Sequence, residues 1–481
     1  MKMSLEEIKQ ISHSSPDQIE KVITKLLERI TELENRVAEL ERQLGLNSKN
    51  SSKPPSSDGF RKPANSRIAG GKKGAPLGHE GHTLSMVDDP DAILDFCLTT
   101  CPACHAPMDQ ENCIGYDRRQ QIDLPEPRIQ TTEFRAHTSC CPQCSGVHQA
   151  AFPSHVSASV QYGAGVTGWI VYVSAYHMIP LKRVSEMFAD LTGHSLSEAT
   201  VIAHLKKSHK QLGPYEEQIR QNLLNADVLH ADETGIHVDG KQRWLHTLSN
   251  VDWTFQAVHE NRGTLAFDAI GLLPAYSGIL VHDCNGPYFK EKYTFQHALC
   301  NAHLLRECQG IADYDHHQWA VQMKRLLQVA WRLTLAARKV LCCLAPSTVK
   351  WLENWYDDIL QQGELEWNQG RTKAKTGPQG RQSKSKSANL GERFRRHKEP
   401  ILRFIQDVRV PFDNNVAERD LRMAKVKAKV SGLFRTWDGA HQFARARGFI
   451  STLRKQNLPV LSTLIVTFRG EFRFPRLEEG K

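Results

Sequence analysis

Three acidic residues stand out in this chain because their types and local contexts suit metal-dependent chemistry. Asp232 and Asp283 each follow a short apolar run typical of a buried strand, and Glu418 lies on a stretch with helical periodicity. Such carboxylates could meet at one edge of a sheet and hold divalent metal ions. Phosphodiester chemistry uses clusters of this kind, because two cations about 3.5–4 Å apart stabilise both the attacking and the leaving oxygen. The three residues therefore predict a phosphoryl-transfer site.

The segment around Glu418 adds candidates for the same site. Asp413 or Asn414 is expected to cap the helix, and Asn414, Glu418 and Arg422 then follow one another at intervals of four along one face. Asn414 and Arg422 could contact phosphate or steady the carboxylate. A single carboxylate is usually an ordinary surface charge, so spacing alone leaves a catalytic cluster and unrelated ion pairs as comparable alternatives.

Length, charge and apolar pattern limit the class of protein. The 481 residues exceed what one core accommodates, so three or four domains are expected. A formal net charge of +9 suits a polyanionic partner, although many other proteins are mildly basic. The longest apolar runs, such as Trp169–Ala175 and Leu458–Phe468, are far shorter than the ~20 residues that span a membrane. The N-terminus also lacks the apolar region of a secretory signal, so a cytoplasmic protein is expected.

The N-terminal segment has a heptad pattern. Apolar residues recur at alternating steps of four and three, namely Ile19, Ile23, Leu26, Ile30, Leu33, Val37, Leu40 and Leu44. Mostly β-branched residues at one seam position and mostly Leu at the other favour a parallel two-stranded coiled coil. Residues 1–46 are therefore predicted to form a homodimer, with a helix packed on its own chain as the alternative. Residues 47–85 are a Ser-, Pro- and Lys-rich linker, suited either to loose phosphate contact or to a solvated tether.

Paired cysteines indicate a small zinc-binding domain over residues 86–155. Cys101 with Cys104, and Cys141 with Cys144, form two Cys-x-x-Cys pairs with the spacing of a tetrahedral zinc site. Four thiolates leave no open coordination position, so this zinc would be structural. Cys140 could replace Cys141 as a ligand, and unmetallated surface thiols are the alternative.

Residues 156–222 are predicted to be helical and to bind DNA. One helix is expected at Pro180–Phe188 and another from Ser197, its N-cap, to Lys207, with a glycine turn at Gly193 between them. This length and punctuation are typical of a helix-turn-helix, whose second helix could enter a major groove. A plain helical hairpin remains the alternative.

Residues 223–450 have the pattern of a mixed sheet flanked by helices. The expected strands are Val228–Glu233, Trp244–Ser249, Thr254–His259, Gly278–His282 and Thr294–Leu299. A helical insertion is expected at about 301–405, interrupted by a disordered-looking basic loop at Arg371–Asn389, and residues 451–481 are expected to be a tail. Glu233 is a weaker site candidate than Asp232, because successive side chains of a strand point to opposite faces.

Several of these segments together resemble the insertion sequence 66 family of bacterial DDE transposases. They are His230–Gly240, Gly278–Tyr288, His297–Arg306, Asp413–Arg422, Ser431–Thr436 and Ser451–Lys455. The resemblance extends across nearly the whole chain, including the leucine-repeat helix and the paired cysteines. It implies a multidomain α+β or α/β protein whose catalytic domain is ribonuclease-H-like, with Asp232, Asp283 and Glu418 as its acidic triad.

The resemblance also implies the activity and its partners. A transposase would use Mg²⁺ or Mn²⁺ at the triad to cleave the ends of an insertion sequence and join them to target DNA. Double-stranded DNA with terminal inverted repeats, accessory proteins of the same element and a nucleoid-associated location are expected. Cys300 and His303 look like a Cys-x-x-His element of several DDE families, open to DNA contact, support of the site or a packed helix start. The candidate DNA contacts are Asn414, Arg419, Arg422, Cys300, His303, Lys206 and Lys207.

Two other functions remain open at this point. A non-catalytic regulator could be built on the zinc and helix-turn-helix modules alone. A related nuclease could cut DNA without joining it.

Overall fold

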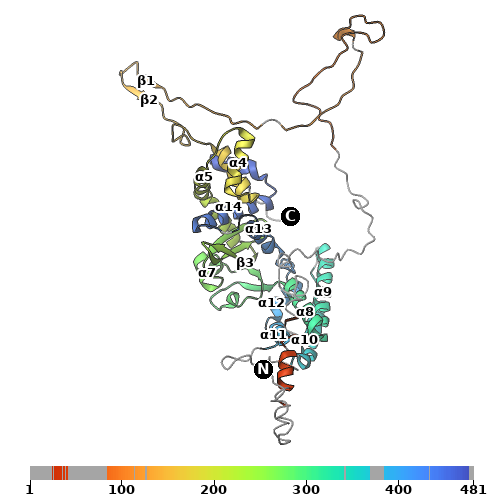
Figure 1. The fold of residues 1–481 in the computed structure, drawn as a ribbon. Helices are drawn as coiled ribbons and strands as arrows, with labels where there is room; N and C mark the ends of the chain where they lie inside the picture. Colours follow the sequence, from red (N-terminus) through yellow and green to blue (C-terminus); the bar gives the residue numbers. More distant parts are fainter. Residues whose placement is uncertain are drawn as a thin grey trace, which may run out of the picture. The chain divides into compact units, whose positions relative to one another are not determined.

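The computed structural model of the chain describes the parts shown in colour in Figure 1. These are residues 24, 27–34, 36–37, 40–41, 84–112, 114–124, 127–340, 343–368, 384–432 and 434–475. Residues 84–132 belong to one compact unit, and residues 133–190 together with 194–475 belong to another. The expected zinc-binding domain of residues 86–155 is thus divided between two units, and each is described by itself. Among the described residues, no helix has both the length and the apolar character that a membrane span requires.

A five-stranded mixed sheet positions the predicted carboxylates. Its strands lie in the order β5-β4-β3-β6-β7. Strands β3, β4 and β5 are antiparallel, whereas β3 with β6 and β6 with β7 are parallel. Their bounds are Val228–Val238 for β3, Lys241–Ser249 for β4, Thr254–His259 for β5, Ile279–His282 for β6 and Gln296–Leu299 for β7. Each of the five expected strands is therefore present, and the mixed α+β architecture is confirmed.

Strand β3 is longer than the sequence analysis expected, because a tight hairpin follows it. The prediction ended the strand at Glu233, but pairing continues to Val238, which lies opposite Lys241. The two residues between them, Asp239 and Gly240, have φ values of 51° and 70°. An Asp-Gly pair tolerates positive φ and suits a two-residue hairpin between twisted strands.

Two long helices pack against the sheet, and a third completes the core. Helix α13 (Asn415–Ser431) contacts β3 and β4, and α14 (Trp437–Lys455) contacts β5. Helix α15 (Val460–Arg469) packs on α3 (Ala164–Val171), where a Cβ on Gly168 would lie 2.8 Å from Ile465. The expected tail from residue 451 is therefore wrong, because α14 continues through that position and Phe468 and Phe472 belong to the core.

Two helices with a glycine turn between them are present where the sequence analysis expected a helix-turn-helix. Helix α4 (Leu181–Thr192) is followed by Gly193, with a φ of 70°, and by α5 (Glu198–Gln211) and α6 (Gly213–Leu224). Ser197 caps α5, since its side chain accepts a hydrogen bond of 3.1 Å from the Thr200 N–H. Both helices continue four residues beyond their expected ends, to Thr192 and to Gln211.

The helical insertion folds around a tryptophan-centred core. The insertion consists of helices α8 (Asn301–Tyr314), α9 (Gln318–Lys339), α10 (Pro346–Asn368), α11 (Lys386–Arg396) and α12 (Lys398–Gln406), which gather to the right of the sheet and below it in Figure 1. Trp319 and Trp367 pack edge to face, with ring centroids 4.9 Å apart. The predicted basic loop is wrong at its C-terminal end, because residues 386–389 are helical and Ser385 caps α11. Residues 371–383 of that loop lie outside the described residues.

Candidate active site

The register of β3 and β6 brings two of the predicted carboxylates together. These strands are parallel neighbours in which His230 lies opposite Val281. Two residues further along, Asp232 on β3 and Asp283 directly after β6 therefore occupy equivalent positions on the same side of the sheet. The Asp232 carboxylate also accepts a hydrogen bond of 2.8 Å from the Glu233 N–H.

Helix α13 reaches the same sheet edge because a buried asparagine fixes its start. The Asn414 side chain donates a hydrogen bond of 2.8 Å to the Ala231 carbonyl of β3, and its oxygen lies 2.9 Å from Nδ1 of His230. Its backbone N–H contacts Sγ of Cys300 at 3.2 Å. Asn414 occupies the N-cap position, but Asp413 is the residue whose side chain accepts the Asn415 N–H. The following turn of α13 carries Glu418.

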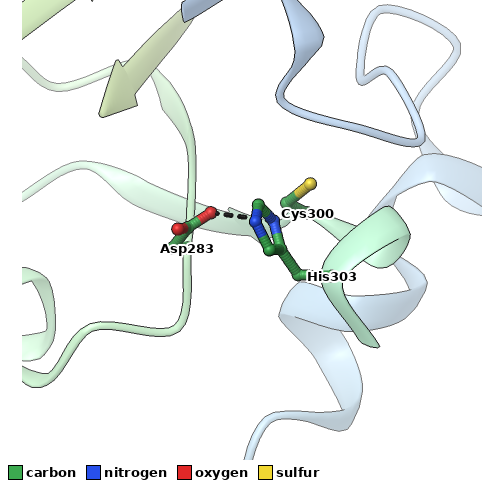
Figure 2. Close-up of side chains that lie close together, drawn as sticks. All are labelled: Asp283, Cys300 and His303. Atoms are coloured by element: carbon green, nitrogen blue, oxygen red, sulfur yellow. Dashed lines mark ion pairs between the residues drawn. The ribbon is translucent and has the colours of Figure 1, made fainter. Parts of the chain in front are cut away.

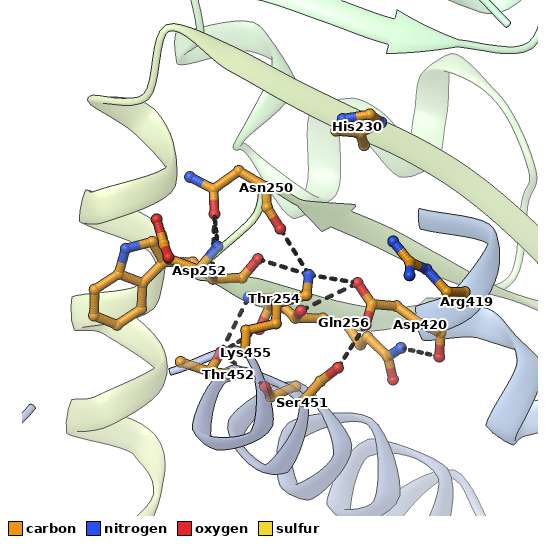
Figure 3. Close-up of polar contacts among 12 residues, drawn as sticks. His230, Asn250, Asp252, Thr254, Gln256, Arg419, Asp420, Ser451, Thr452 and Lys455 are labelled. Carbon is orange, nitrogen blue, oxygen red and sulfur yellow. Dashed lines mark hydrogen bonds and ion pairs between the residues drawn. The ribbon is translucent and has the colours of Figure 1, made fainter. Parts of the chain in front are cut away.

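A second buried network holds α13 from its other side (Figure 3). The Asp420 carboxylate contacts Thr254 on β5 at 3.1 Å, and Lys455 at 2.8 Å and Ser451 at 2.5 Å on α14. Lys455 also donates to the backbone carbonyl of Asn250. The Asp420 and Lys455 side chains are only 6% and 16% exposed. The network lies two residues beyond Glu418 and therefore fixes the rotation of that helix about its axis.

A histidine from the insertion joins the acidic residues. His303 lies in the first turn of α8, and its Nδ1 is 3.1 Å from an Asp283 oxygen and 3.8 Å from a Glu418 oxygen. Figure 2 shows Asp283 and His303 facing each other, with Cys300 beside them. Arg306, one turn later on α8, approaches Glu418 at 3.9 Å. Side chains from the end of β6, from α8 and from α13 thus converge on one point.

Burial and like charges set the electrostatics of this cluster. Burial raises the pKa of Asp232 well above its usual range, and the negative charges of Asp283, Glu233 and Glu418 raise it further. Burial also raises the pKa of Asp283, but the contact with His303 outweighs this effect and holds the pKa below normal. Burial lowers the pKa of His303, whereas contacts with Asp283 and Cys300 raise it to about 11. His303 therefore carries the positive charge that balances Asp283 in this structure.

Glu233 belongs to a separate network on the opposite face of β3, as the strand alternation predicts. Its side chain is 2% exposed and lies 2.9 Å from Arg262. Asn285 and Tyr288, in the loop that follows Asp283, also donate to it at 2.8 and 2.7 Å. Glu233 thereby fixes the loop that carries Asp283.

The side chains predicted to contact DNA differ in their exposure to solvent. Lys206 and Lys207 on α5, and Arg419 and Arg422 on α13, are exposed. Asn414 is fully buried and Cys300 is 2% exposed, so neither side chain is available to DNA and these two expectations are wrong. His303 faces Asp283 and Glu418 instead. The sequence analysis did not single out Arg306 or Arg262, since no local pattern relates them to residues so distant in the chain.

The two cysteine pairs form similar turns, each within its own unit. In the first, the Cys101 N–H donates to Ala106 and the His105 N–H donates to Cys101. In the second, the Cys141 N–H donates to the Gly146 carbonyl and the Ser145 N–H donates to the Cys141 carbonyl. Hydrogen bonds, chiefly from the backbone N–H groups two and three residues later, lower the thiol pKa of both Cys101 and Cys141. Each turn is therefore shaped to favour a thiolate at its first cysteine.

Comparison with known proteins identifies two regions of the chain. Residues 159–442, more than half of the chain, match the model of the family described as "Transposase IS66 family". Residues 6–85 match a second model, described as "Family of unknown function (DUF6444)". No curated protein matches the chain.

The Asp420–Lys455 pair gives a prediction about the anchoring of α13. Replacing Lys455 by Met should leave a buried carboxylate without its counter-charge and lower the free energy of unfolding by about 3–5 kcal/mol. Urea denaturation of the full chain measures the change. Lys182→Met, which removes an exposed lysine 3.8 Å from Glu186, is the matched control and should cost far less. Equal effects of the two substitutions would contradict the anchoring role.

Proposed function

Because the chain belongs to the IS66 transposase family, we propose that Asp232, Asp283 and Glu418 are the catalytic carboxylates of a DNA strand-transfer reaction. The enzyme cleaves DNA at the ends of an insertion sequence and joins the freed 3′ ends to target DNA. The convergence of Asp283 and Glu418 on His303, from a strand end and from a helix, carries this proposal. The effect of both charges on the pKa of Asp232 supports the inclusion of the third carboxylate.

The donor atoms of this cluster suit divalent cations. Carboxylate oxygens are the ligands that Mg²⁺ and Mn²⁺ take in proteins. The Asp283 Oδ1 and Glu418 Oε1 atoms are buried and have no hydrogen-bond partner among the described residues. Bound cations supply a water of lowered pKa and stabilise charge on the attacking and leaving oxygens. Three neighbouring carboxylates would hold such ions, and the ions would offset their mutual repulsion.

The protein's own residues orient this chemistry. Asn414 and Asp420 set the position of Glu418, and Glu233 sets the loop after Asp283. A cavity of about 170 Å³ adjoins Asp283, and Arg262 and Arg393 form part of its wall. Arginine in such a position suits contact with a DNA phosphate.

The sheet supports a ribonuclease-H-like catalytic domain. Three antiparallel strands are followed by two parallel strands, with the carboxylates on β3 and directly after its neighbour β6. The helical hairpin α4–α5, with exposed Lys206 and Lys207, is the candidate for reading terminal repeats. The acidic cluster favours the enzyme over a non-catalytic regulator, because DNA binding alone does not require buried carboxylates to converge.

Substitution of one carboxylate tests the catalytic proposal. Asp283→Asn should reduce cleavage and joining of a terminal-repeat substrate by about 10²–10³-fold or more, because a group that supports the transition-state charge is lost. Gel-shift binding to the same DNA should persist. Asp268→Asn, at a carboxylate paired with Tyr293, is the matched control and should leave activity unchanged.

Three outcomes would contradict the proposal in different ways. Full activity of Asp283→Asn would refute the assignment of the triad. Cleavage by the unmodified chain without a joined product would indicate a nuclease. Binding without cleavage under Mg²⁺ and under Mn²⁺ would indicate a regulator.

The two Cys-x-x-Cys pairs in the sequence support the proposal of a structural zinc ion held by Cys101, Cys104, Cys141 and Cys144. Cys141 begins its turn as Cys101 does, whereas Cys140 ends the preceding strand β1 (Thr138–Cys140). The hydrogen bonds that lower the pKa of Cys101 and Cys141 favour the thiolate that zinc requires. This comparison favours Cys141 over Cys140 as the ligand.

Metal analysis of single variants tests the zinc ligands. The full chain should retain about one zinc ion per chain after dialysis, as a closed four-thiolate site predicts. Cys141→Ser should lose this zinc, and Cys140→Ser, the matched control, should keep it. Retention in Cys141→Ser with loss in Cys140→Ser would reverse the assignment, and a zinc-free chain would refute the site.

The heptad pattern supports a homodimer. The described residues of 24–41 are helical, and Ile30, Leu33, Val37 and Leu40 on the predicted seam are about half exposed in the single chain. The other four seam positions lie outside the described residues. A second copy of the same helix would bury this seam and hold two DNA-binding chains together.

Light scattering on seam variants tests the dimer. The full chain should have the mass of a dimer, and the double variant Leu33→Glu, Val37→Glu should be monomeric, because two charges per helix would face each other. Thr31→Glu, outside the seam, adds the same charge type and should remain dimeric. A monomeric full chain, or a dimeric seam variant, would contradict the prediction.

A further inference from the structure

His303 faces the acidic cluster with a potential metal-binding atom. Asp283, Cys300 and His303 offer ligand atoms that all lie within 4.8 Å of one another. Figure 2 shows the three side chains close together. Nδ1 of His303 is also 3.8 Å from Glu418. An oxygen-only carboxylate site thus has an imidazole nitrogen directly beside it.

The contact between His303 and the carboxylates is close but lacks hydrogen-bond geometry. Nδ1 of His303, Oδ1 of Asp283 and Oε1 of Glu418 are all buried, and none has a hydrogen-bond partner in the part of the chain that the structure describes. Buried polar atoms are normally satisfied by protein or water. Three such atoms that converge on one point indicate a ligand that accepts lone pairs from all of them, which is a metal cation that takes the place of the proton on Nδ1 and releases it to solvent.

The separations of these atoms agree with coordination of one ion. Ligand atoms about 2.0–2.2 Å from a shared ion and at right angles to each other lie about 3 Å apart. The observed distances from Nδ1 are 3.1 Å to Asp283 and 3.8 Å to Glu418. Both lie within the range for neighbouring positions of a slightly distorted site.

The backbone around His303 is held in place independently of any ion. At the start of α8 the Asn301 N–H donates to Phe412 and the Asn301 side chain donates to Ile401, both at 3.0 Å. Cys300 is already engaged by the Asn414 N–H and is buried. Cys300 therefore acts as a positioning residue, while His303 in the first helical turn remains directed at the carboxylates.

We propose that His303 Nδ1 is a protein ligand of the cation that Asp283 and Glu418 share. The inference rests on the proposed function, because it concerns the same metal site. Mn²⁺, a first-row transition metal, accepts an imidazole nitrogen as well as carboxylate oxygens, whereas Mg²⁺ prefers oxygen ligands throughout. This position therefore selects Mn²⁺ over Mg²⁺, and the selectivity depends on one nitrogen atom.

Electron spin-echo spectroscopy of Mn²⁺ added to the full chain without DNA tests the ligand directly. The unmodified chain should show ¹⁴N modulation from a coordinated imidazole. His303→Gln should lose this modulation and bind Mn²⁺ about 10–100-fold more weakly, while Mg²⁺ affinity changes much less. His237→Gln, at an exposed histidine of β3, is the matched control and should retain both the modulation and the affinity.

The outcomes separate this inference from the proposed function. Mn²⁺ that binds in an Asp283-dependent manner but shows no ¹⁴N modulation would overturn the His303 inference and leave the triad intact. Modulation that persists in His303→Gln would overturn it as well. Absence of Mn²⁺ binding to the unmodified chain would overturn both. The spectrum of the unmodified chain decides the question even where a variant fails to fold.

Discussion

Repulsion among like charges is the constraint around which the region of the five-stranded sheet is organised. Asp232, Asp283 and Glu418 come from a strand, a strand end and a helix. Burial is the largest cause of the raised pKa of Asp232, and the charges of the other two carboxylates raise it further. Away from bulk water such repulsion is weakly screened, so the fold must oppose it with positive groups and rigid supports. The positive end of the α13 dipole lies near Glu418, which is in the first turn of that helix. His303 and Arg306 add positive side chains from α8.

Rigid support comes from anchors on both sides of Glu418. Asn414 attaches the start of α13 to β3, and Asp420 attaches the next turn to β5 and α14. Both anchors are buried, and each bonds to an element distant in the sequence. A helix held at only one of these points could rotate its carboxylate away from Asp283. The two networks together therefore fix the position of the Glu418 side chain relative to the sheet.

The sequence predicted the parts of this site that depend on local pattern. Apolar runs and alternation located the strands. The alternation of side chains along β3 also predicted that Glu233 and Asp232 point to opposite faces of the sheet. The Asp239-Gly240 pair is a hairpin signal in the sequence, but the predicted strand ends at Glu233, before that pair. The partners of Asn414, Asp420 and Glu233 could not be predicted, because no periodicity links them to residues many elements away. The helical pattern therefore predicted that Asn414 contacts DNA at the surface. In the structure its side chain is completely buried and is hydrogen-bonded to β3.

Hydrogen-bond satisfaction distinguishes the structural carboxylates from the proposed catalytic ones. Glu233 is bonded to Arg262, Asn285 and Tyr288, and Asp420 is bonded to three side chains, so each is neutralised where it lies. The buried oxygens of Asp283 and Glu418 have close positive neighbours but no hydrogen bond among the described residues. Leaving buried acceptors in that state costs free energy of about 1–3 kcal/mol each. The same fold gives Glu233 and Asp420 all the partners they need. The free-energy cost at Asp283 and Glu418 is therefore explained if a bound ligand offsets it. The unsatisfied pair, rather than the number of acids, is the stronger argument for a cation at this sheet edge.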